Sequence, residues 1–147
     1  MKKIFIIFFF ILSACGYNPI YQSNQKNYIF NEIVMSGEKK LIRQIISALS
    51  FKEDKTNEKL STILLDIKKN KISTSKNTKG QITSYRLTIS LNLIIEENSK
   101  KIKEKKIVKD LTYNTKENKF DLAEYEKQVE QNLMQQIIEE VNIFLNI

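Results

Sequence analysis

The stretch Thr83-Ser84-Tyr85-Arg86-Leu87-Thr88-Ile89-Ser90-Leu91-Asn92-Leu93-Ile94-Ile95 alternates between large apolar side chains and mostly polar ones. Successive side chains of a β-strand point to opposite faces of its sheet. This period of two therefore predicts a long strand with one buried face and one polar face. The buried face would carry Tyr85, Leu87, Ile89, Leu91, Leu93 and Ile95, and the polar face Ser84, Arg86, Thr88, Ser90 and Asn92.

Further strands are predicted on both sides of this one. Upstream, residues 61–72 alternate in the same way, and the polar residues 73–80, which end in a glycine, predict a hairpin turn. Downstream, residues 96–100 predict a second turn, and a lysine-rich strand is expected at 103–113. A shorter strand with incomplete period-two spacing is expected at about 28–34.

A first helix is expected between the short strand and residue 61. Ser36 is the expected N-cap, with Glu38 in the first turn, where the helix dipole favours a carboxylate. The helix should end near Ser50 and lead into a charged loop at 52–59. Its apolar stripe consists of Leu41, Ile42, Ile45, Ile46 and Leu49.

A second, longer helix is expected after a loop at residues 114–119. Asp121 is its expected N-cap, and Glu124, three positions later, completes an arrangement like a capping box. The apolar stripe of this helix consists of Leu122, Tyr125, Val129, Leu133, Ile137, Val141 and Phe144, and the opposite face carries Lys127, Gln128, Gln131, Gln135 and Glu139.

The element order is therefore β-α-β-β-β-α, and the predicted fold class is α+β. We expect a two-layer sandwich in which two helices pack on one face of a four-stranded, antiparallel-rich sheet. A chain of 147 residues with 41% hydrophobic and 28% charged residues suits one globular domain.

Composition also excludes several kinds of site. The chain has one cysteine and no histidine, so neither an internal disulfide nor Ser-His-Asp or Cys-His catalysis is possible. Zinc and iron rarely accept carboxylates alone, so no metal and no cofactor is expected. The carboxylate pair Glu96 and Glu97 falls in a turn, and the pair Asp121 and Glu124 is explained by helix capping. We therefore expect a protein that is not an enzyme.

The N-terminus has the pattern of an export signal. Lys2 and Lys3 precede an apolar run at residues 4–12, which is too short to span a bilayer and typical of a signal peptide. Leu12-Ser13-Ala14-Cys15 follows and resembles the bacterial lipobox, in which the cysteine is acylated after cleavage in front of it. The alternative, a small residue in a buried helix, does not explain the basic and apolar residues before it.

This signal sets the expected organisation of the chain. Residues 1–14 would be removed, residues 15–26 would form a lipidated tether beginning at Cys15, and residues 27–147 would form the single domain. Two or more acyl chains anchor a protein stably to a membrane. Gly16 follows the cysteine where an aspartate often marks inner-membrane retention, which favours the outer membrane. Nucleic acid is not an expected partner of an exported chain, although the net charge is +7.

Three segments together resemble the lipopolysaccharide-assembly lipoprotein LptE family. They are Cys15-Gly16-Tyr17-Asn18-Pro19-Ile20-Tyr21 directly after the lipobox, Gly80-Gln81-Ile82-Thr83-Ser84-Tyr85-Arg86-Leu87 at the start of the long strand, and Tyr113-Asn114 to Phe120 before the long terminal helix. The resemblance covers nearly the whole chain in element order. The chain departs from the family in its lysine-heavy fourth strand and its short C-terminus.

The resemblance implies a lipid-anchored protein on the periplasmic side of the outer membrane. It would occupy the lumen of the β-barrel translocon LptD, assist assembly of that barrel, and bind lipopolysaccharide during insertion into the outer leaflet. The family has no enzymatic activity. The alternative is an envelope lipoprotein of the same size that binds another protein or lipid and has no part in lipopolysaccharide transport.

Five cations are candidates for binding lipid phosphates, because ammonium and guanidinium groups pair with phosphate. Lys76 and Lys79 lie before the long strand, Arg86 lies on its polar face, and Lys116 and Lys119 precede the last helix. Each of them can equally be a solvated surface charge. The polar face of the long strand is likewise open to two interpretations, since either water or a polar barrel wall can cover it.

Overall fold

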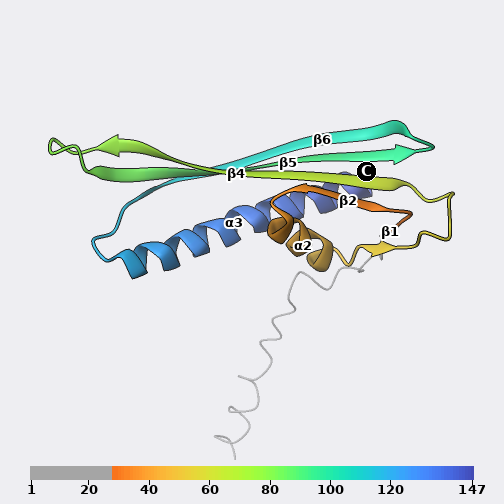
Figure 1. The fold of residues 1–147 in the computed structure, drawn as a ribbon, viewed down its shortest axis with the longest axis horizontal. Coiled ribbons are helices and arrows are strands. Elements are labelled where there is room, and N and C mark those ends of the chain that lie inside the picture. The colour runs from red at the N-terminus through yellow and green to blue at the C-terminus, as the bar shows by residue number, and fades with distance from the viewer. Residues whose placement is uncertain (1–27) are drawn as a thin grey trace, which may run out of the picture.

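The computed structural model describes residues 28–147. The expected signal peptide, Cys15 and the expected tether lie outside the described residues. Within them the fold is α+β, as predicted. A mixed sheet has the strand order β2-β4-β5-β6, and both helices lie on one face of it (Figure 1).

The strands of this sheet are β2 Ile33–Gly37, β4 Thr62–Lys76, β5 Ile82–Glu97 and β6 Lys100–Asn114. β4, β5 and β6 are antiparallel neighbours, whereas β2 runs parallel to β4. The helices are α2 Lys39–Ala48, between β2 and β4, and α3 Lys119–Asn146, which runs under the sheet to the C-terminus.

The core lies between the helices and the inner face of β5. All five aliphatic residues predicted for the buried face of the long strand are buried, and Tyr85 is half-buried against them. The α3 stripe meets this face through Val129, Leu133, Ile137 and Val141. The row Ile67, Leu91 and Ile107 crosses three strands at the centre of the sheet, and all three side chains are buried.

The short first strand was predicted as one element and is two. β1 Ile29–Phe30 pairs in parallel with β3 Lys52–Glu53, and the chain then moves to β2 and the main sheet. Phe30 in β1 and Phe51, directly before β3, pack edge to face with ring centroids 5.2 Å apart. The charged loop expected at 52–59 therefore begins with a strand, whose two-residue length is too short for a periodic signal.

The predicted cap of α2 at Ser36 is wrong. Ser36 belongs to β2 and pairs in register with Asp66, because β2 continues along β4 through Gly37. Gly37 has a φ of +78° and turns the chain away from the sheet. Glu38 then occupies the N-cap position without a side-chain hydrogen bond, and the helix ends at Ala48, slightly before the expected Ser50.

The predicted cap of α3 at Asp121 is also wrong. Asn118 is the N-cap, and its Oδ1 accepts a hydrogen bond of 2.8 Å from the backbone N–H of Phe120. Asp121 lies in the first helical turn, where its carboxylate faces the positive end of the helix dipole. The expected capping box with Glu124 is therefore replaced by a single asparagine cap.

Lysines on the inner face of the sheet flank α3 on both sides. On β4, Lys69 pairs with Glu130 at 2.8 Å, and Lys71 pairs with Glu126. On β6, Lys109 and Lys105 both pair with Glu140, at 2.8 and 3.3 Å. Lys105 and Lys109 of the lysine-rich strand therefore join the sheet to α3, and their ammonium groups are already paired with a carboxylate.

Candidate functional site

The β4–β5 hairpin extends beyond the rest of the sheet (Figure 1). β2 pairs with β4 only as far as Ile67, and β6 ends opposite Ser84, so the last residues of the hairpin have no third strand beside them. β4 runs to Lys76, which is further than residue 72 predicted from sequence. The hairpin therefore forms a two-stranded arm with a short tip at residues 77–81.

The tip of the arm is a turn ordered by one asparagine. Asn77 Oδ1 accepts hydrogen bonds of 3.0 Å from the backbone N–H groups of both Lys79 and Gln81. Gly80 supplies the left-handed backbone of the turn, with a φ of +78°. Lys76 and Lys79 are exposed at this tip, and neither has an ion-pair partner among the residues of the described domain.

Ser84 lies on the same side of β5 as Arg86, as predicted for the polar face, but it is not exposed. Its side chain is buried, and its hydroxyl lies 2.6 Å from the hydroxyls of both Thr74 and Ser75. The pairing of β4 with β5 changes register between Ser73 and Ser75. This bulge in β4 brings Thr74 and Ser75 beside Ser84, and the three hydroxyls satisfy one another there.

Arg86 lies on the outer face of the sheet, as predicted, but it is engaged by its neighbours. Its Nε donates a hydrogen bond of 3.1 Å to Thr112 Oγ1 and lies 3.8 Å from Asp110 Oδ2. A guanidinium held by a carboxylate has less free energy to gain from a phosphate. The structure thus separates Arg86 from the lysine candidates in both position and pairing.

Lys116 lies at the base of the arm, on the helix side. Its ammonium lies 4.7 Å from the centroid of the Tyr125 ring, and Tyr125 packs edge to face on Tyr113, which in turn contacts Tyr85. The Tyr113 hydroxyl donates to Glu126 at 3.0 Å, and burial together with this carboxylate raises the pKa of the phenol. Sequence reasoning missed this tyrosine cluster, because the register of β5 with β6 brings Tyr85 and Tyr113 together and the packing of α3 adds Tyr125.

Exposed apolar side chains accompany the lysines at this end of the molecule. Phe120, next to Lys119 at the start of α3, is 75% exposed, and Ile82 on the arm is also exposed. Ile72, which pairs with Arg86 at the base of the arm, is exposed as well. The arm and the loop between β6 and α3 lie at the same end of the molecule (Figure 1). We call this surface the distal end and define it by Ile72, Lys76, Lys79, Ile82, Lys116, Lys119 and Phe120.

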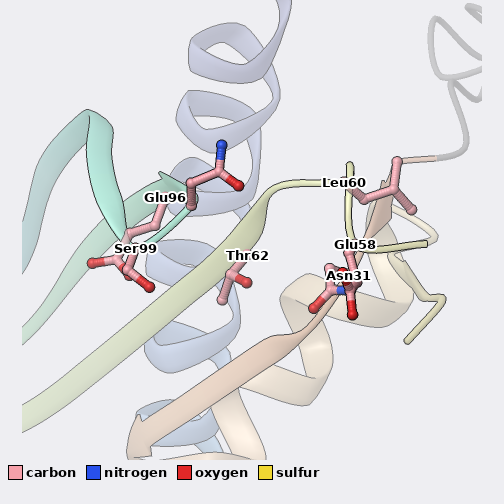
Figure 2. Close-up of a pocket in the computed structure, with 7 residues that line it drawn as sticks. Asn31, Glu58, Leu60, Thr62, Glu96 and Ser99 are labelled. Carbon is pink, nitrogen blue, oxygen red and sulfur yellow. The ribbon is translucent and has the colours of Figure 1, made fainter. Parts of the chain in front are cut away.

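A small hollow of about 190 Å³ lies at the other end of the sheet. Figure 2 shows its lining, which comes from the residue after β1, the loop before β4, β4 itself and the β5–β6 turn. The lining residues are Asn31, Glu58, Leu60, Thr62, Glu96, Asn98 and Ser99. No basic side chain lines the hollow, so it is unsuited to a phosphate.

Within residues 28–147, no group of histidine, cysteine, aspartate and glutamate side chains is placed to hold a metal ion.

The outer face of the sheet has no helix over it (Figure 1). A polar hollow of about 350 Å³ lies on this face. Its lining is of mixed charge and includes Asp66, Lys68, Asn92, Glu104 and Lys106.

Neither α2 nor α3 is long and apolar enough to cross a membrane.

Comparison with solved structures shows what this fold is similar to. A rare lipoprotein B from Shewanella oneidensis matches 79% of this chain and 94% of its own, with a TM-score of 0.59 and 13% identity. A minor lipoprotein from Acinetobacter baumannii matches 78% and 89%, with a TM-score of 0.56 and 11% identity. The fold is shared with bacterial lipoproteins.

A third structure, lipoprotein B from Nitrosomonas europaea, matches 78% of this chain and 81% of its own, with a TM-score of 0.54 and 9% identity. No protein-family model matches the chain, and no curated protein matches it by sequence. At these identities the comparison establishes the two-layer α+β fold.

Proposed function

We propose that the mature chain is an outer-membrane lipoprotein that faces the periplasm, is anchored through acyl groups on Cys15, and binds lipopolysaccharide within an LptD-like β-barrel. In this role it plugs the barrel, assists its assembly and performs no catalysis. Two observations support the lipoprotein part: the lipobox-like sequence before Cys15, and a fold shared with bacterial lipoproteins.

The distal end is the observation that carries the lipid-binding part. Lys76, Lys79 and Lys119 have no ion-pair partner within the described domain, and Lys116 contacts only the face of Tyr125. They are accompanied by exposed Phe120 at the start of α3, Ile82 on the arm and Ile72 at the base of the arm. Lipid A offers phosphates for ammonium groups and acyl chains for apolar side chains, so this combination suits it.

The outer face of the sheet supports the barrel part of the proposal. It is uncovered by helices and carries polar and charged side chains of both signs around the hollow at Asp66, Lys68 and Lys106. The interior of a membrane β-barrel is polar. A polar surface is therefore the kind of surface that a protein inside a barrel needs.

A pull-down tests the partner. The tagged, acylated protein is recovered from detergent-solubilised outer membranes, and the co-purifying proteins are identified by mass spectrometry. We expect a large β-barrel protein in near-stoichiometric amount after stringent washing. Recovery of the protein alone or with unrelated partners contradicts the barrel assignment and favours a lipoprotein that binds another protein or lipid.

A charge-reversal pair tests the lipid. Lys79→Glu with Lys116→Glu should weaken lipopolysaccharide binding at least about tenfold, because two ammonium–phosphate contacts become repulsive. The matched control is Lys59→Glu with Lys100→Glu, which makes the same change in net charge at exposed lysines at the opposite end of the sheet. Equal binding by the two double variants contradicts lipid binding at the distal end.

A further inference from the structure

Helix α2 presents a cationic face to solvent. Lys39 and Lys40 in its first turn and Arg43 one turn later are all exposed. Positions three and four apart share one side of a helix, so Arg43 lies beside both lysines. None of the three has an ion-pair partner within residues 28–147, in contrast with Lys69 and Lys109, which carboxylates of α3 hold on the sheet.

The same face borders a shallow hollow between the two helices. The hollow measures about 580 Å³, and its lining is mainly apolar. From α2 it is lined by Lys40, Arg43, Gln44, Ser47 and Ala48, and Ile138 of α3 lies across it. Lysine and arginine can lay their methylene stems on such a surface and extend their charged groups outward. A mixed surface of this kind suits the head-group region of a bilayer.

The chain joins the folded domain on the same helical layer. Tyr28, the first described residue, donates a hydrogen bond of 3.2 Å from its hydroxyl to Asn142 Oδ1 on α3. Its ring also packs edge to face on Phe51, just after α2, with centroids 5.6 Å apart. Residues 16–27 separate Cys15 from Tyr28, and a fully extended chain of that length reaches at most about 45 Å. An anchor on Cys15 therefore keeps Tyr28, at the edge of this layer, within about 45 Å of the membrane surface.

We propose that the α2 face, formed by Lys39, Lys40 and Arg43, rests on the anionic phospholipid head groups of the membrane that holds the anchor. The inference depends on the acylation of Cys15 in the proposed function, but not on the barrel or on lipopolysaccharide. Each cation near an anionic surface adds a modest attraction. A contact too weak to capture a free protein can orient a tethered one, because the tether makes the contact intramolecular. In this orientation, which describes the anchored protein before it engages any barrel, the uncovered face of the sheet points away from the membrane and is open to a partner.

The test uses the acylated full-length protein on vesicles that contain neither lipopolysaccharide nor barrel. A fluorophore is attached through Ser47→Cys on α2, or through Asn70→Cys on the outer face of the sheet; both positions are exposed. The vesicles carry a head-group quencher and consist of phosphatidylcholine, with or without phosphatidylglycerol. We expect quenching at position 47 and not at position 70, only with phosphatidylglycerol, and its loss in high salt.

Charge reversal completes the test. Lys39→Glu, Lys40→Glu and Arg43→Glu together should reduce quenching at position 47 to the level seen at position 70. The matched triple variant Lys59→Glu, Lys100→Glu and Lys106→Glu, with the same charge change outside α2 and outside the distal end, should leave it intact. Equal quenching at both positions, or equal loss in both triple variants, overturns the proposal.

Flotation on vesicles of phosphatidylcholine alone separates the anchor from the orientation. Protein that fails to float lacks the anchor, which overturns both the lipoprotein assignment and the orientation. Protein that floats without differential quenching overturns the orientation alone. Failure of lipopolysaccharide binding at the distal end is measured separately and does not alter these results.

Discussion

Lys109 on edge strand β6 and Glu140 near the end of α3 are joined by a 2.8 Å contact between ammonium and carboxylate. Lys105 approaches the same carboxylate to 3.3 Å. The hydrogen bond from Lys109, followed by that from Lys105, holds the pKa of Glu140 below its usual value. One carboxylate thus fixes the C-terminal part of α3 to the open edge of the sheet.

This pairing predicts a pH-dependent cost for Glu140→Gln. The pKa of Glu140 is lower in the folded state than in the unfolded state. The stabilisation by this ion pair is therefore present at pH values above the unfolded-state pKa, and it is lost as the pH falls through the folded-state pKa. The variant should be less stable by up to about 1 kcal/mol at pH 7, since the groups are partly exposed. The difference from the parent protein should vanish in strong acid. Urea unfolding at several pH values measures it, with Glu32→Gln as an exposed control; a constant difference at all pH values contradicts the ion-pair explanation.

Two isoleucines of α3 predict opposite outcomes for the same substitution. Ile137 is fully buried against the sheet, whereas Ile143 is 61% exposed. Ile137→Ala should reduce the free energy of unfolding by about 2–5 kcal/mol, through lost burial and the cavity left behind. Ile143→Ala should change it by less than about 0.5 kcal/mol. Denaturant titration of both variants measures the contrast, and similar losses would contradict this packing of α3.

The hydrogen bond at the N-terminus of α3 predicts that Asn118, and not Asp121, stabilises this end of the helix. Asn118→Ala removes the side-chain acceptor for the Phe120 N–H and should cost about 1 kcal/mol. Asp121→Ala removes a first-turn charge but no capping acceptor, and should cost only a few tenths of a kcal/mol. Thermal unfolding of the two variants ranks them. A larger loss for Asp121→Ala would favour the cap expected from sequence.

The two described glycines with positive φ predict unequal costs for alanine. A Cβ at Gly37 would lie 2.1 Å from the carbonyl oxygen of Ile67, so β2 and β4 would have to separate there. At Gly80, in the tip of the arm, a Cβ would meet nothing within 4 Å. Gly37→Ala should cost about 3 kcal/mol or more, and Gly80→Ala only about 1–2 kcal/mol from the backbone conformation. Equal midpoints in urea would contradict the close approach of β2 to β4.

Much of the fold could be predicted because its elements have strong periodic signals. Each aliphatic position from Leu87 to Ile95 on the apolar side of the long strand is buried, since one face of the sheet is covered by helices and a slip of one residue would expose all of them. The apolar stripe of α3 faces the sheet for the same reason. The α2 stripe is likewise buried or partly buried along its length.

The errors fall where signals are local or short. The pairing of β1 with β3 involves two residues on each strand, and no pattern of that length is distinguishable from a loop. Ser36 and Asp121 are both good capping residues by type. Ser36 instead belongs to β2 and pairs with Asp66 of β4. Asn118, not Asp121, is the residue directly before the first turn of α3, where its side chain caps the helix. Ser84 is buried because Thr74 and Ser75, beside a bulge in β4 near the tip of the arm, place their hydroxyls against its own.

For the candidate site, the sequence indicated which loops carry the cations, but not whether each cation is paired with a carboxylate. Lys76, Lys79, Lys116 and Lys119 do lie at one end of the molecule, as their places before β5 and α3 allow. The pairing of Arg86 with Asp110 and Thr112 depends on the register of β5 with β6. The exposure of Phe120 beside Lys119 depends on where α3 begins.

The sequence by itself determined the layers of this protein, because period-two and period-3.6 patterns fix which faces must be buried. It also determined the expected export and anchoring signal at Cys15, which is local chemistry that needs no fold. Only the tertiary structure decided which lysines are free. An ion pair such as that of Lys109 with Glu140 joins residues far apart in the chain, and its formation depends on how α3 crosses the sheet.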